Sequence, residues 1–591
     1  MSLRTSIIIS FWMLTFTALI CVCERGSRAA GPFYVSATAS SGGDGSFGNP
    51  WKLSTICAGD PNFNNNPQPP AAIVPGVTIY LRGGTPYQDP ATPKGQAAGC
   101  YFSGTSGNPI KMMPYPGERV TIDRNYSESS NPAWSSSTTY ASGAFVRSLN
   151  KVWKSLQSGN LNNAPGGQQV PPVDTAFWTQ YGLADWEAPL LIGGSYVWVI
   201  GMEIANTNTD RTVSRPEGLV LKGVGTKAIN NIIHDNCDGV WPEATALGAE
   251  VYGNIVFNNG TTEQGASGTC HGMYMQNSDA SQPKLITLNL IFDNYSLGLQ
   301  AYASNSDVLR GFTYRYNAVY SNGTPVGAFH EGMILGGNSS PANMYSLTVD
   351  TNYFHGGGLQ VGYGSGTANN DATVTNNIIS GSEMVVFRTW VTITLNNNTV
   401  QATSSGFIQV ISPDFSPSWS WNNNSYFGTS TLPFLTNGGN GFENLANWRI
   451  ETTFDAASTY TNGVPSIAPI LRANAYDNTK TYIIIFNFTD ASTVSVDVSS
   501  RLNNGDTYAL RNPQDYYGTP VLTGTYSGSN LTVPMTGLSV QQPYGGAVTV
   551  PFSGPRFATF VLDKTTASSS AAQATTSGGV KLSGAATIHE E

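Results

Sequence analysis

The sequence predicts an all-β protein: a solenoid whose turns each hold three short strands, followed by a small antiparallel β-sandwich. An asparagine followed by a strand-like triplet recurs between residues 231 and 427, and repeat periods of about 20 to 50 residues are typical of solenoids. The segments between these repeats are short β-branched and aromatic runs broken by glycine and asparagine. They carry no helical periodicity.

Length and composition narrow the classes of function. The chain has 591 residues, with 28 basic and 37 acidic side chains, a formal net charge of −9 and only 11% charged residues. A net-acidic chain with so few cations binds nucleic acid poorly, so we expect no nucleic-acid partner. A low-charge surface rich in Asn, Ser, Thr, Gly and aromatic residues suits neutral polar ligands better.

Residues 1–30 read as a secretory signal. Arg4 gives a positive start, Ser6–Ile20 is mostly apolar, and Ser27–Ala29 offers a cleavage site flanked by small residues. The alternatives are a membrane anchor, for which the apolar run is shorter than the roughly 20 residues a span needs, and a lipid anchor at Cys21. We therefore expect a secreted or cell-surface monomer without membrane contact after signal cleavage.

Four cysteines follow the predicted signal. An even number in an exported chain favours disulfides. Pairing neighbours in sequence joins Cys57 to Cys100 and Cys237 to Cys270, although four cysteines allow three pairings. Zinc binding is the alternative, but no CxxC or HxxxH spacing supports it. The tail, residues 565–591, is rich in Ser, Ala, Thr and Gly, and we expect it to be disordered.

The asparagine repeat fixes the expected geometry of the solenoid. Its spacing runs from 21 to 35 residues, and the minimum matches one turn of three short strands. Asparagine tolerates left-handed backbone conformations and bonds neighbouring backbone groups, so we expect a stacked asparagine ladder at one corner. The extra residues of longer turns would form loops on one side. The asparagines are Asn231, Asn254, Asn289, Asn317, Asn352, Asn377, Asn398 and Asn424.

These repeats, with two N-terminal segments, resemble the right-handed parallel β-helix proteins of the pectate-lyase-like superfamily. Phe33–Trp51 resembles the opening of many secreted bacterial β-helices, and Val77–Gly84 and Gly104–Asp123 look like the first coils. The resemblance implies a right-handed parallel β-helix as the fold. It implies no single activity, because the fold hosts lyases, hydrolases, epimerases and adhesins.

Residues 134–186 interrupt the pattern and resemble small carbohydrate-binding modules of the chitin- or cellulose-binding kind. Tyr140, Trp153 and Trp178 match the motif of such modules. The resemblance implies exposed rings that stack on sugars, with Trp153 and Trp178 as candidate substrate-binding residues. The alternative is a structural insert whose aromatic residues form a small core of their own.

Residues 465–564 read as alternating strands of an antiparallel β-sandwich, as in Tyr482–Phe488 and Phe557–Leu562. They are similar to the all-β domains that end many secreted glycosidases, which implies a packing accessory rather than a catalytic unit. The expected domains are a signal (1–30), an N-terminal cap with the first coils (31–133), the insert (134–186), the main β-helix (187–464), the sandwich (465–564) and the tail (565–591).

A second column of strands, each opened by glycine, places candidate binding residues on one face. Strand side chains alternate between faces, so one set should fill the core and the other should point outward. A strip of rings and amides suits a neutral sugar chain, unless long loops cover it. The last strand fits less well, with Ile408 outward. The expected core set is Val240, Met273, Met275, Leu299, Ala301, Met333, Leu335, Leu359 and Val361. The expected outward, substrate-binding set is Trp241, Tyr274, Gln276, Gln300, Tyr302 and Gln360.

Ionisable residues precede three of these glycines: Asp238, His271 and Glu331. Stacked coils lie about 4.8 Å apart, so Asp238 and His271 would couple, and the carboxylate would raise the pKa of the histidine and orient it as a general base. A Cys237–Cys270 disulfide would fix their spacing. Glu243 would pair with Asp238, since glycoside hydrolysis uses two carboxyl groups roughly 5 to 9.5 Å apart. The alternative for each residue is a structural role in a turn.

The expected function is hydrolysis of a largely neutral polysaccharide, with Asp238, Glu243, His271 and Glu331 as catalytic candidates. One alternative is a lyase on a uronate-containing chain, with His271 as base and Tyr274 as acid. Another is a non-catalytic glycan-binding or surface-attachment protein. The calcium-binding acidic cluster and the triple-aspartate pattern of the resembling families are absent. No cofactor is recognisable, and calcium remains a candidate without a motif behind it.

Overall fold

The computed structural model describes most of the chain between residues 31 and 565. The described ranges are 31–59, 67–88, 99–125, 132–148, 151–165, 175–183, 188–212, 215–262, 270–328, 330–364, 368–388, 390–411, 418–436 and 441–565. The predicted signal, residues 1–30, and the predicted tail beyond residue 565 lie outside these ranges. The described residues contain no helix with the length and hydropathy of a membrane span.

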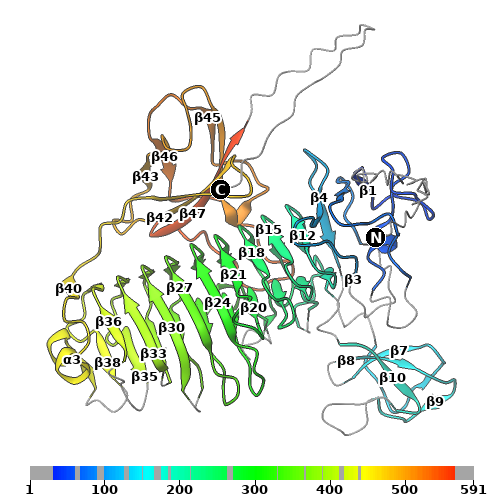
Figure 1. The fold of residues 1–591 in the computed structure, drawn as a ribbon, viewed down its shortest axis with the longest axis horizontal. Helices are drawn as coiled ribbons and strands as arrows, with labels where there is room; N and C mark the ends of the chain where they lie inside the picture. Colours follow the sequence, from blue (N-terminus) through cyan, green and yellow to red (C-terminus); the bar gives the residue numbers. More distant parts are fainter. Residues whose placement is uncertain are drawn as a thin grey trace, which may run out of the picture.

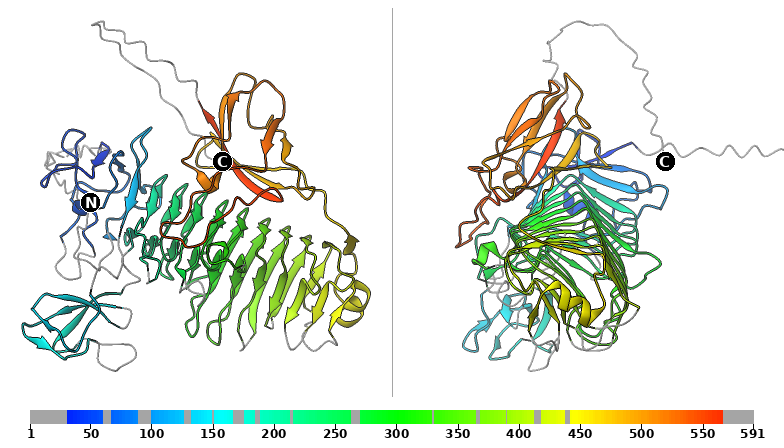
Figure 2. Two further views of the ribbon diagram at one scale, coloured as in Figure 1. Left: turned by 180° about the vertical axis from the view of Figure 1, so that it is seen from behind. Right: turned by 90° about the vertical axis from the view of Figure 1, so that its left-hand side faces the viewer.

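Three long sheets wind into one parallel β-helix, so the predicted fold class is confirmed. Figure 1 shows their strands stacked side by side along the solenoid, and the end-on view in Figure 2 looks along it. Each turn passes through a strand of the first sheet, then the third, then the second, as in β15, β16 and β17. Strand-to-strand pairing is parallel throughout the first and third sheets.

The strands of each sheet are given in spatial order. The first sheet contains β1 (Phe33–Val35), β2 (Thr78–Leu81), β4 (Ile110–Pro114), β12 (Val197–Ile200), β15 (Lys227–Ile229), β18 (Glu250–Tyr252), β21 (Lys284–Thr287), β24 (Arg310–Arg315), β27 (Tyr345–Asp350), β30 (Asn369–Thr375), β33 (Trp390–Asn396) and β36 (Ser420–Asn422). The second sheet contains β3 (Gly99–Cys100), β11 (Leu190–Ile192), β14 (Leu219–Leu221), β17 (Val240–Pro242), β20 (Met273–Met275), β23 (Leu299–Ala301), β26 (Met333–Leu335), β29 (Leu359–Val361), β32 (Met384–Phe387), β35 (Ile408–Ile411), β38 (Phe434–Thr436) and the antiparallel β39 (Phe442–Glu443). The third sheet contains β5 (Thr121–Asp123), β13 (Glu203–Ala205), β16 (Ile232–His234), β19 (Ile255–Phe257), β22 (Leu290–Phe292), β25 (Ala318–Tyr320), β28 (Tyr353–His355), β31 (Ile378–Ser380), β34 (Thr399–Gln401), β37 (Ser425–Gly428) and β40 (Thr459–Asn462).

The predicted asparagine ladder runs along the corner between the first and third sheets. Asn254 Oδ1 accepts hydrogen bonds from the backbone nitrogen of Asn231 (2.9 Å) and from its Nδ2 (3.0 Å). The same two bonds join Asn254 to Asn289, and they recur at every step to Asn424. These buried amides satisfy one another and the turn backbone.

The left-handed backbone of this corner belongs to a different residue from the one expected. None of the eight ladder asparagines has a positive φ, whereas the residue before each one does. Leu288 (φ 60°) and Thr351 (φ 56°) adopt this conformation although they are not asparagine. The strained position is therefore held by the bonds of the asparagine that follows it, since an isolated non-glycine residue disfavours it.

A second, shorter ladder lies at the corner between the third and second sheets. Asn236, Asn259, Asn294 and Asn322 repeat the pattern, and the Oδ1 of each of the last three accepts from the preceding asparagine. This ladder explains three of the glycines that open strands of the second sheet: Gly239, Gly272 and Gly298. A Cβ on Gly272 would lie 2.6 Å from Asn294 Nδ2, so only glycine fits there.

The core of the β-helix contains the whole inward set predicted from the second sheet, each side chain at most 1% exposed. Ile408 also points inward and is fully buried, so its expected outward orientation is wrong; Gln409 points outward instead. Short helices close both ends of the solenoid. Helix α1 (Leu53–Ile56) lies at the first coils, and Trp448 of α3 (Leu445–Thr452) stacks on Phe434 at the last.

Both predicted disulfides are present: Cys57 pairs with Cys100 and Cys237 with Cys270. The first joins the residue after α1 to strand β3. The second joins two adjacent turns at the entrance to the second sheet, immediately before Asp238 and His271.

The insert forms a small antiparallel unit at the N-terminal end (Figure 1). Trp153 and Trp178 are fully buried and pack with Tyr140 and Val146, while their Nε1 atoms donate to backbone carbonyls of the insert. The expectation that these two rings stack on sugars is therefore wrong, because a unit this small needs its largest side chains for its own core. Its strands are β6 (Thr139–Tyr140), β7 (Phe145–Ser148), β8 (Lys151–Ser155), β9 (Asn160–Leu161) and β10 (Trp178–Leu183).

The C-terminal domain has two antiparallel sheets that enclose an apolar core. It lies along the outside of the β-helix (Figure 2) and covers the middle of the third sheet, where Phe557 packs against Tyr320 and Phe486 packs against Phe557. Its strands are β41 (Ile470–Ala473), β42 (Lys480–Phe486), β43 (Thr493–Val496), β44 (Thr507–Arg511), β45 (Leu522–Thr525), β46 (Leu531–Pro534) and β47 (Phe557–Thr565). This domain also contains the short helix η4 (Pro513–Asp515). Another short helix, η3 (Thr324–Val326), follows strand β25 of the β-helix.

Two buried protonated groups lie where this domain meets the β-helix. Gln514 Nε2 donates to Asp293 Oδ2 at 2.6 Å, and burial raises the pKa of Asp293 to about 8. Burial alone would lower the pKa of His234, but hydrogen bonds to Asp235 and Glu203 outweigh it and raise this pKa to about 9. At neutral pH the interface therefore contains a neutral carboxylic acid and a charged imidazole.

These pKa values predict an interface that weakens in alkali. Asp293 has a higher pKa folded (about 8) than its ordinary 3.8, so its stabilisation is complete at acid pH and is lost as pH rises to about 8. His234, raised from 6.5 to about 9, loses its stabilisation as pH rises through 9. Asp293→Asn mimics the protonated acid. The difference in Tm between this variant and the wild type should grow in the variant's favour from pH 5 to pH 9.

Differential scanning calorimetry across this pH range measures that difference. The control is Asp497→Asn, an exposed carboxyl of the same domain, which should shift Tm equally at all these pH values. A constant difference for Asp293→Asn would contradict the assignment.

Loss of one ladder amide should destabilise the β-helix. Asn289→Ala leaves the two donors of Asn254 and the carbonyl of Val251 without their partner, and buried unpaired polar groups should cost about 2–5 kcal/mol together. The urea midpoint should fall accordingly. Asn305→Ala, at an exposed loop position, should change the free energy of unfolding by no more than about 0.5 kcal/mol. Equal effects would show that the ladder contributes nothing special.

Candidate active site

The outer face of the second sheet aligns the predicted binding residues in columns. The pairing registers place Trp241, Tyr274 and Gln300 beside one another on consecutive coils. Ile334 follows Gln300, so the polar row is interrupted before it resumes at Gln360. The residues therefore share the predicted face, and their role in binding a substrate stays a prediction.

Aromatic side chains cluster at the N-terminal part of this face. Trp241 packs against a small apolar patch that includes Leu191 and Val220, and its ring meets Tyr274 edge-on with centroids 6.1 Å apart. Tyr302 lies one coil further and contacts Tyr363 with centroids 5.5 Å apart. All four rings are half-buried, so each presents part of its surface on this face.

The amides and hydroxyls of this face are held by hydrogen bonds to the same or the neighbouring coil. Tyr274 Oη donates to the carbonyl of Tyr302 (3.0 Å), and Gln276 Nε2 donates to the same carbonyl (3.3 Å). Gln360 Nε2 donates to the carbonyl of Gly362 (2.9 Å), and Gln300 bonds the imidazole of His271. These bonds hold the side chains in fixed positions along the sheet, as pre-organised binding sites require.

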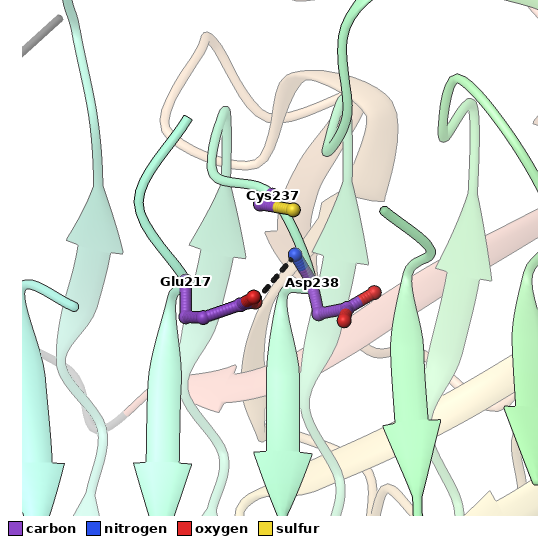
Figure 3. A group of neighbouring side chains, drawn as sticks. All are labelled: Glu217, Cys237 and Asp238. Atoms are coloured by element: carbon purple, nitrogen blue, oxygen red, sulfur yellow. Dashed lines mark hydrogen bonds between the residues drawn. The ribbon is translucent and has the colours of Figure 1, made fainter. Parts of the chain in front are cut away.

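Two carboxylates lie together at the entrance to strands β14 and β17. Ligand oxygens of Glu217 and Asp238 lie within 4.8 Å of each other, and both residues are buried. Glu217 Oε2 accepts from the backbone nitrogen of Asp238 (2.8 Å), and Asp238 Oδ1 accepts from the backbone nitrogen of His271 (2.5 Å). Figure 3 shows Glu217 directed at that nitrogen while the side chain of Asp238 points onward. Each carboxylate is thus oriented by the coil that follows.

The expected coupling between Asp238 and the His271 ring is wrong. Asp238 bonds the backbone of His271 rather than its imidazole, and burial lowers the pKa of His271 to about 4. Its Nδ1 has no hydrogen-bond partner among the described residues. The ring stacks against Tyr274 with centroids 6.1 Å apart, and burial raises the pKa of that tyrosine hydroxyl. At neutral pH this is a neutral histidine beside a protonated tyrosine.

The expected pairing of Glu243 with Asp238 is also wrong. The two residues flank strand β17 at opposite ends, and five residues of extended chain span roughly 16 Å. Glu243 instead forms a salt bridge with Lys222 at 2.8 Å. Such a separation exceeds the roughly 9.5 Å upper limit for a glycosidase pair.

Glu331 lies further along the same edge, where the structure adds a carboxyl that the sequence patterns did not indicate. Glu383 takes the register position of the glycines, beside Gly358. Gln409 Nε2 donates to its Oε2 at 2.6 Å, and burial and the charge of Glu331 together raise the pKa of Glu383. Both glutamates are half-buried, so both carboxyls belong to the accessible part of this face.

Glu217 was missed although the sequence contains its signal. It directly precedes Gly218, which opens strand β14 with the same pattern as the glycines counted from residue 239 onward. Extending that column by one coil would have placed Glu217 next to Asp238. Glu383 carried no such signal, because it replaces the glycine that defines the column.

The donors at Glu217 and Asp238 are too few to hold a calcium ion by themselves. Cys237 Sγ lies within reach of both carboxylates, but it is bonded to Cys270 and is no thiolate ligand. Two carboxylates remain in this group of described residues, against the roughly six to eight oxygen ligands that calcium takes. Calcium stays a prediction, and the chemistry considered below uses none.

Comparisons with known proteins find related sequences over part of the chain. Residues 163–322 match the family described as a protein of unknown function, DUF1565. Pectate lyase L of Thermoclostridium stercorarium is 24% identical over 322 residues, which covers 51% of this chain and 24% of that protein. The aligned part therefore spans about a quarter of that relative's length.

Solved structures similar to this chain include two carbohydrate-active enzymes. Pectate lyase Pel9A is 13% identical with a TM-score of 0.40, covering 80% of this chain and 86% of that one. The GH136 lacto-N-biosidase from Eubacterium ramulus is 14% identical with a TM-score of 0.38, covering 74% of this chain and 68% of that one.

Proposed function

We propose that this protein is an exported, carbohydrate-active enzyme that hydrolyses a polysaccharide bound along the outer face of the second sheet. The observation that carries the proposal is the close pair of carboxylates on Glu217 and Asp238, in which one oxygen of each lies within 4.8 Å of the other. Retaining glycosidases use two carboxyl groups about 5–5.5 Å apart. The two disulfides support export, because such bonds persist in oxidising compartments.

In this proposal the ionised carboxyl of the pair attacks the anomeric carbon, and the glycosidic bond breaks as the protonated carboxyl donates to the leaving oxygen. Water then attacks the same carbon and releases the first carboxylate, while the second carboxyl, now ionised, takes the proton of that water. The backbone hydrogen bonds from Asp238 and His271 hold the two carboxyls in place before substrate arrives. Such pre-organisation lowers the cost of reaching the transition state. The sequence candidates Asp238, His271 and Glu331 remain in the site, whereas Glu243 leaves it.

The substrate in this proposal is a largely neutral glycan. Trp241 and Tyr274 offer ring surface for the C–H faces of sugars, and Gln276, Gln300 and Gln360 offer amides to hydroxyl groups. Cations are scarce on this face of the described structure. Lys222 is paired with Glu243, and Arg388 Nη1 donates to the carbonyls of Gly337 and Tyr363.

A second candidate function is β-elimination on a uronate-containing chain. The relative named Pectate lyase L supports it, and so does the pair of His271 and Tyr274. The lowered pKa of His271, about 4, leaves its ring able to accept a proton at neutral pH. Tyr274, whose pKa is raised by burial, is protonated and able to donate one.

One experiment separates these functions. The purified protein is incubated with a panel of neutral and uronate-containing polysaccharides, and both reducing ends and the absorbance of unsaturated products are followed. Hydrolysis predicts reducing ends without absorbance. Glu217→Gln and Asp238→Asn should each lower kcat by about 10²–10⁴-fold, because each removes one member of the acid–base pair. The matched control, Glu243→Gln, should change kcat by less than about tenfold.

Other outcomes point elsewhere. Reducing ends with absorbance, abolished by His271→Ala and unaffected by Glu217→Gln, would favour elimination. Retention on an insoluble glycan with neither signal would replace the enzyme by a binding protein.

A further inference from the structure

A cavity of about 680 Å³ lies on a different sheet from the candidate active site. Three parts of the chain meet there: the N-terminal loop from Gly83 to Pro86, the outer face of the third sheet at β5, β13 and β16, and the C-terminal loop that carries Tyr544. Junctions between domains are preferred places for ligand pockets. The cavity lies beyond the part of the third sheet that the apolar face of the C-terminal domain covers.

The floor of the cavity contains two carboxylates that are already fully engaged. Glu203 accepts from Arg119 Nε (2.9 Å) and Nη2 (2.6 Å), from Thr121 Oγ1 and from His234 Nε2 (3.2 Å). Since a carboxylate has about four acceptor sites, these donors fill it.

Asp123 is engaged in the same way. It accepts from Gln88 Nε2 (2.8 Å), from the backbone nitrogen of Asn125 (3.0 Å), and from the backbone nitrogen (2.9 Å) and Oγ1 (2.7 Å) of Thr207. Neither carboxylate therefore has the open positions that a cation would need. A ligand would have to bind through other groups.

The charges in this floor are fixed at neutral pH. Burial would raise the pKa of Glu203, but hydrogen bonds from His234 and Arg119 lower it to about 2. His234 is held as a cation between Asp235 and Glu203, with a pKa of about 9. Neither Glu203 nor His234 is poised to exchange a proton near pH 7, so this pair is suited to binding rather than to acid–base chemistry.

The groups left to contact a ligand are a ring and neutral or balanced donors. Tyr544 is 41% exposed, and the side chain of Arg119 is 51% exposed. The guanidinium of Arg119 lies over the ring of Tyr517, 3.5 Å from its centroid. Its charge is balanced by Glu203, and its exposed edge can donate to a ligand. Thr85 adds an exposed hydroxyl. An aromatic face beside hydroxyl and guanidinium donors matches a neutral sugar.

We propose that this cavity is a second, non-catalytic carbohydrate-binding site, in which a neutral sugar residue stacks on Tyr544 and accepts hydrogen bonds from Arg119 and Thr85. The choice of a sugar as ligand rests on the function proposed above. The site would hold a second segment of the same polysaccharide and so concentrate the enzyme on its substrate, as linked binding sites do.

The ring of Tyr544 can be removed without breaking the contact between the domains. The hydrogen bonds of that contact use main-chain atoms: the Tyr544 nitrogen donates to Asp235 Oδ1 (2.9 Å), and its carbonyl accepts from Arg211 Nε (2.8 Å). The ring adds a stacking contact with His234, with centroids 6.5 Å apart. Tyr544→Ala keeps both bonds, so it tests the ring itself. Tyr544→Phe keeps the ring and removes only the hydroxyl.

The test measures binding of neutral tetrasaccharides (from xylan, cellulose, mannan and galactan) to the full chain by isothermal titration calorimetry. Cleavage of the polymer found in the screen is measured in parallel. Binding is measured in the Asp238→Asn background to prevent turnover. Tyr544→Ala should weaken one class of binding site by about tenfold, with cleavage of short soluble substrates unchanged. Tyr544→Phe should bind within about twofold of the parent protein. Tyr476→Ala, at another partly exposed tyrosine of the same domain, is the matched control and should also have no effect.

The outcomes separate this proposal from the function on which it rests. Intact cleavage with unchanged binding in Tyr544→Ala, or equal losses in Tyr544→Phe and Tyr544→Ala, would overturn the second site and leave the enzyme standing. Tyr544-dependent binding in a protein that cleaves nothing would support the site and overturn the enzyme.

Discussion

The mutual hydrogen bonding of buried asparagines is the interaction on which the rest of this structure depends. Each ladder amide satisfies the backbone and side chain of its neighbour, so adjacent coils stack in one register, about 4.8 Å apart. The second ladder excludes side chains from three of the glycines that open strands of the second sheet. Because both corners are fixed, residues at equivalent positions of successive coils fall into straight columns. The carboxylates of Glu217 and Asp238 and the rings of Trp241 and Tyr274 are neighbours for this reason.

The outer faces of the second and third sheets differ in what covers them. The middle of the third sheet carries stacked rings such as Phe257 and Phe292 and is covered by the C-terminal domain. The second sheet keeps its outer face for the proposed substrate. The polar N-terminal end of the third sheet is where the covering domain leaves a cavity, walled by Tyr544. Two histidines differ in the same way at neutral pH. His234 is a cation at the domain junction, whereas His271 is neutral on the proposed catalytic face.

Short-range periodicity made much of the fold predictable, and the limits of the prediction have physical causes. The inward set and the ladder follow from spacing along single coils, and both disulfides follow the pairing of cysteines adjacent in sequence. The role of Asp238 was misjudged because a backbone N–H in the next turn competes for its carboxylate, and no sequence pattern reports that competition. The predicted pairing of Glu243 with Asp238 was wrong because the extended strand β17 separates the two residues. Trp153 and Trp178 were expected outside, but the packing needs of a small unit placed them in its core.

The central claim is that Glu217 and Asp238 act together on a glycosidic bond, and the anomeric configuration of the first product tests it most directly. Proton NMR during the first minutes of cleavage distinguishes the two anomers before they interconvert. Two carboxylates this close, with one oxygen of each within 4.8 Å of the other, predict a product that retains the configuration of the substrate. An inverted product, which requires carboxyl groups roughly 6.5–9.5 Å apart, or an unsaturated product would contradict this account.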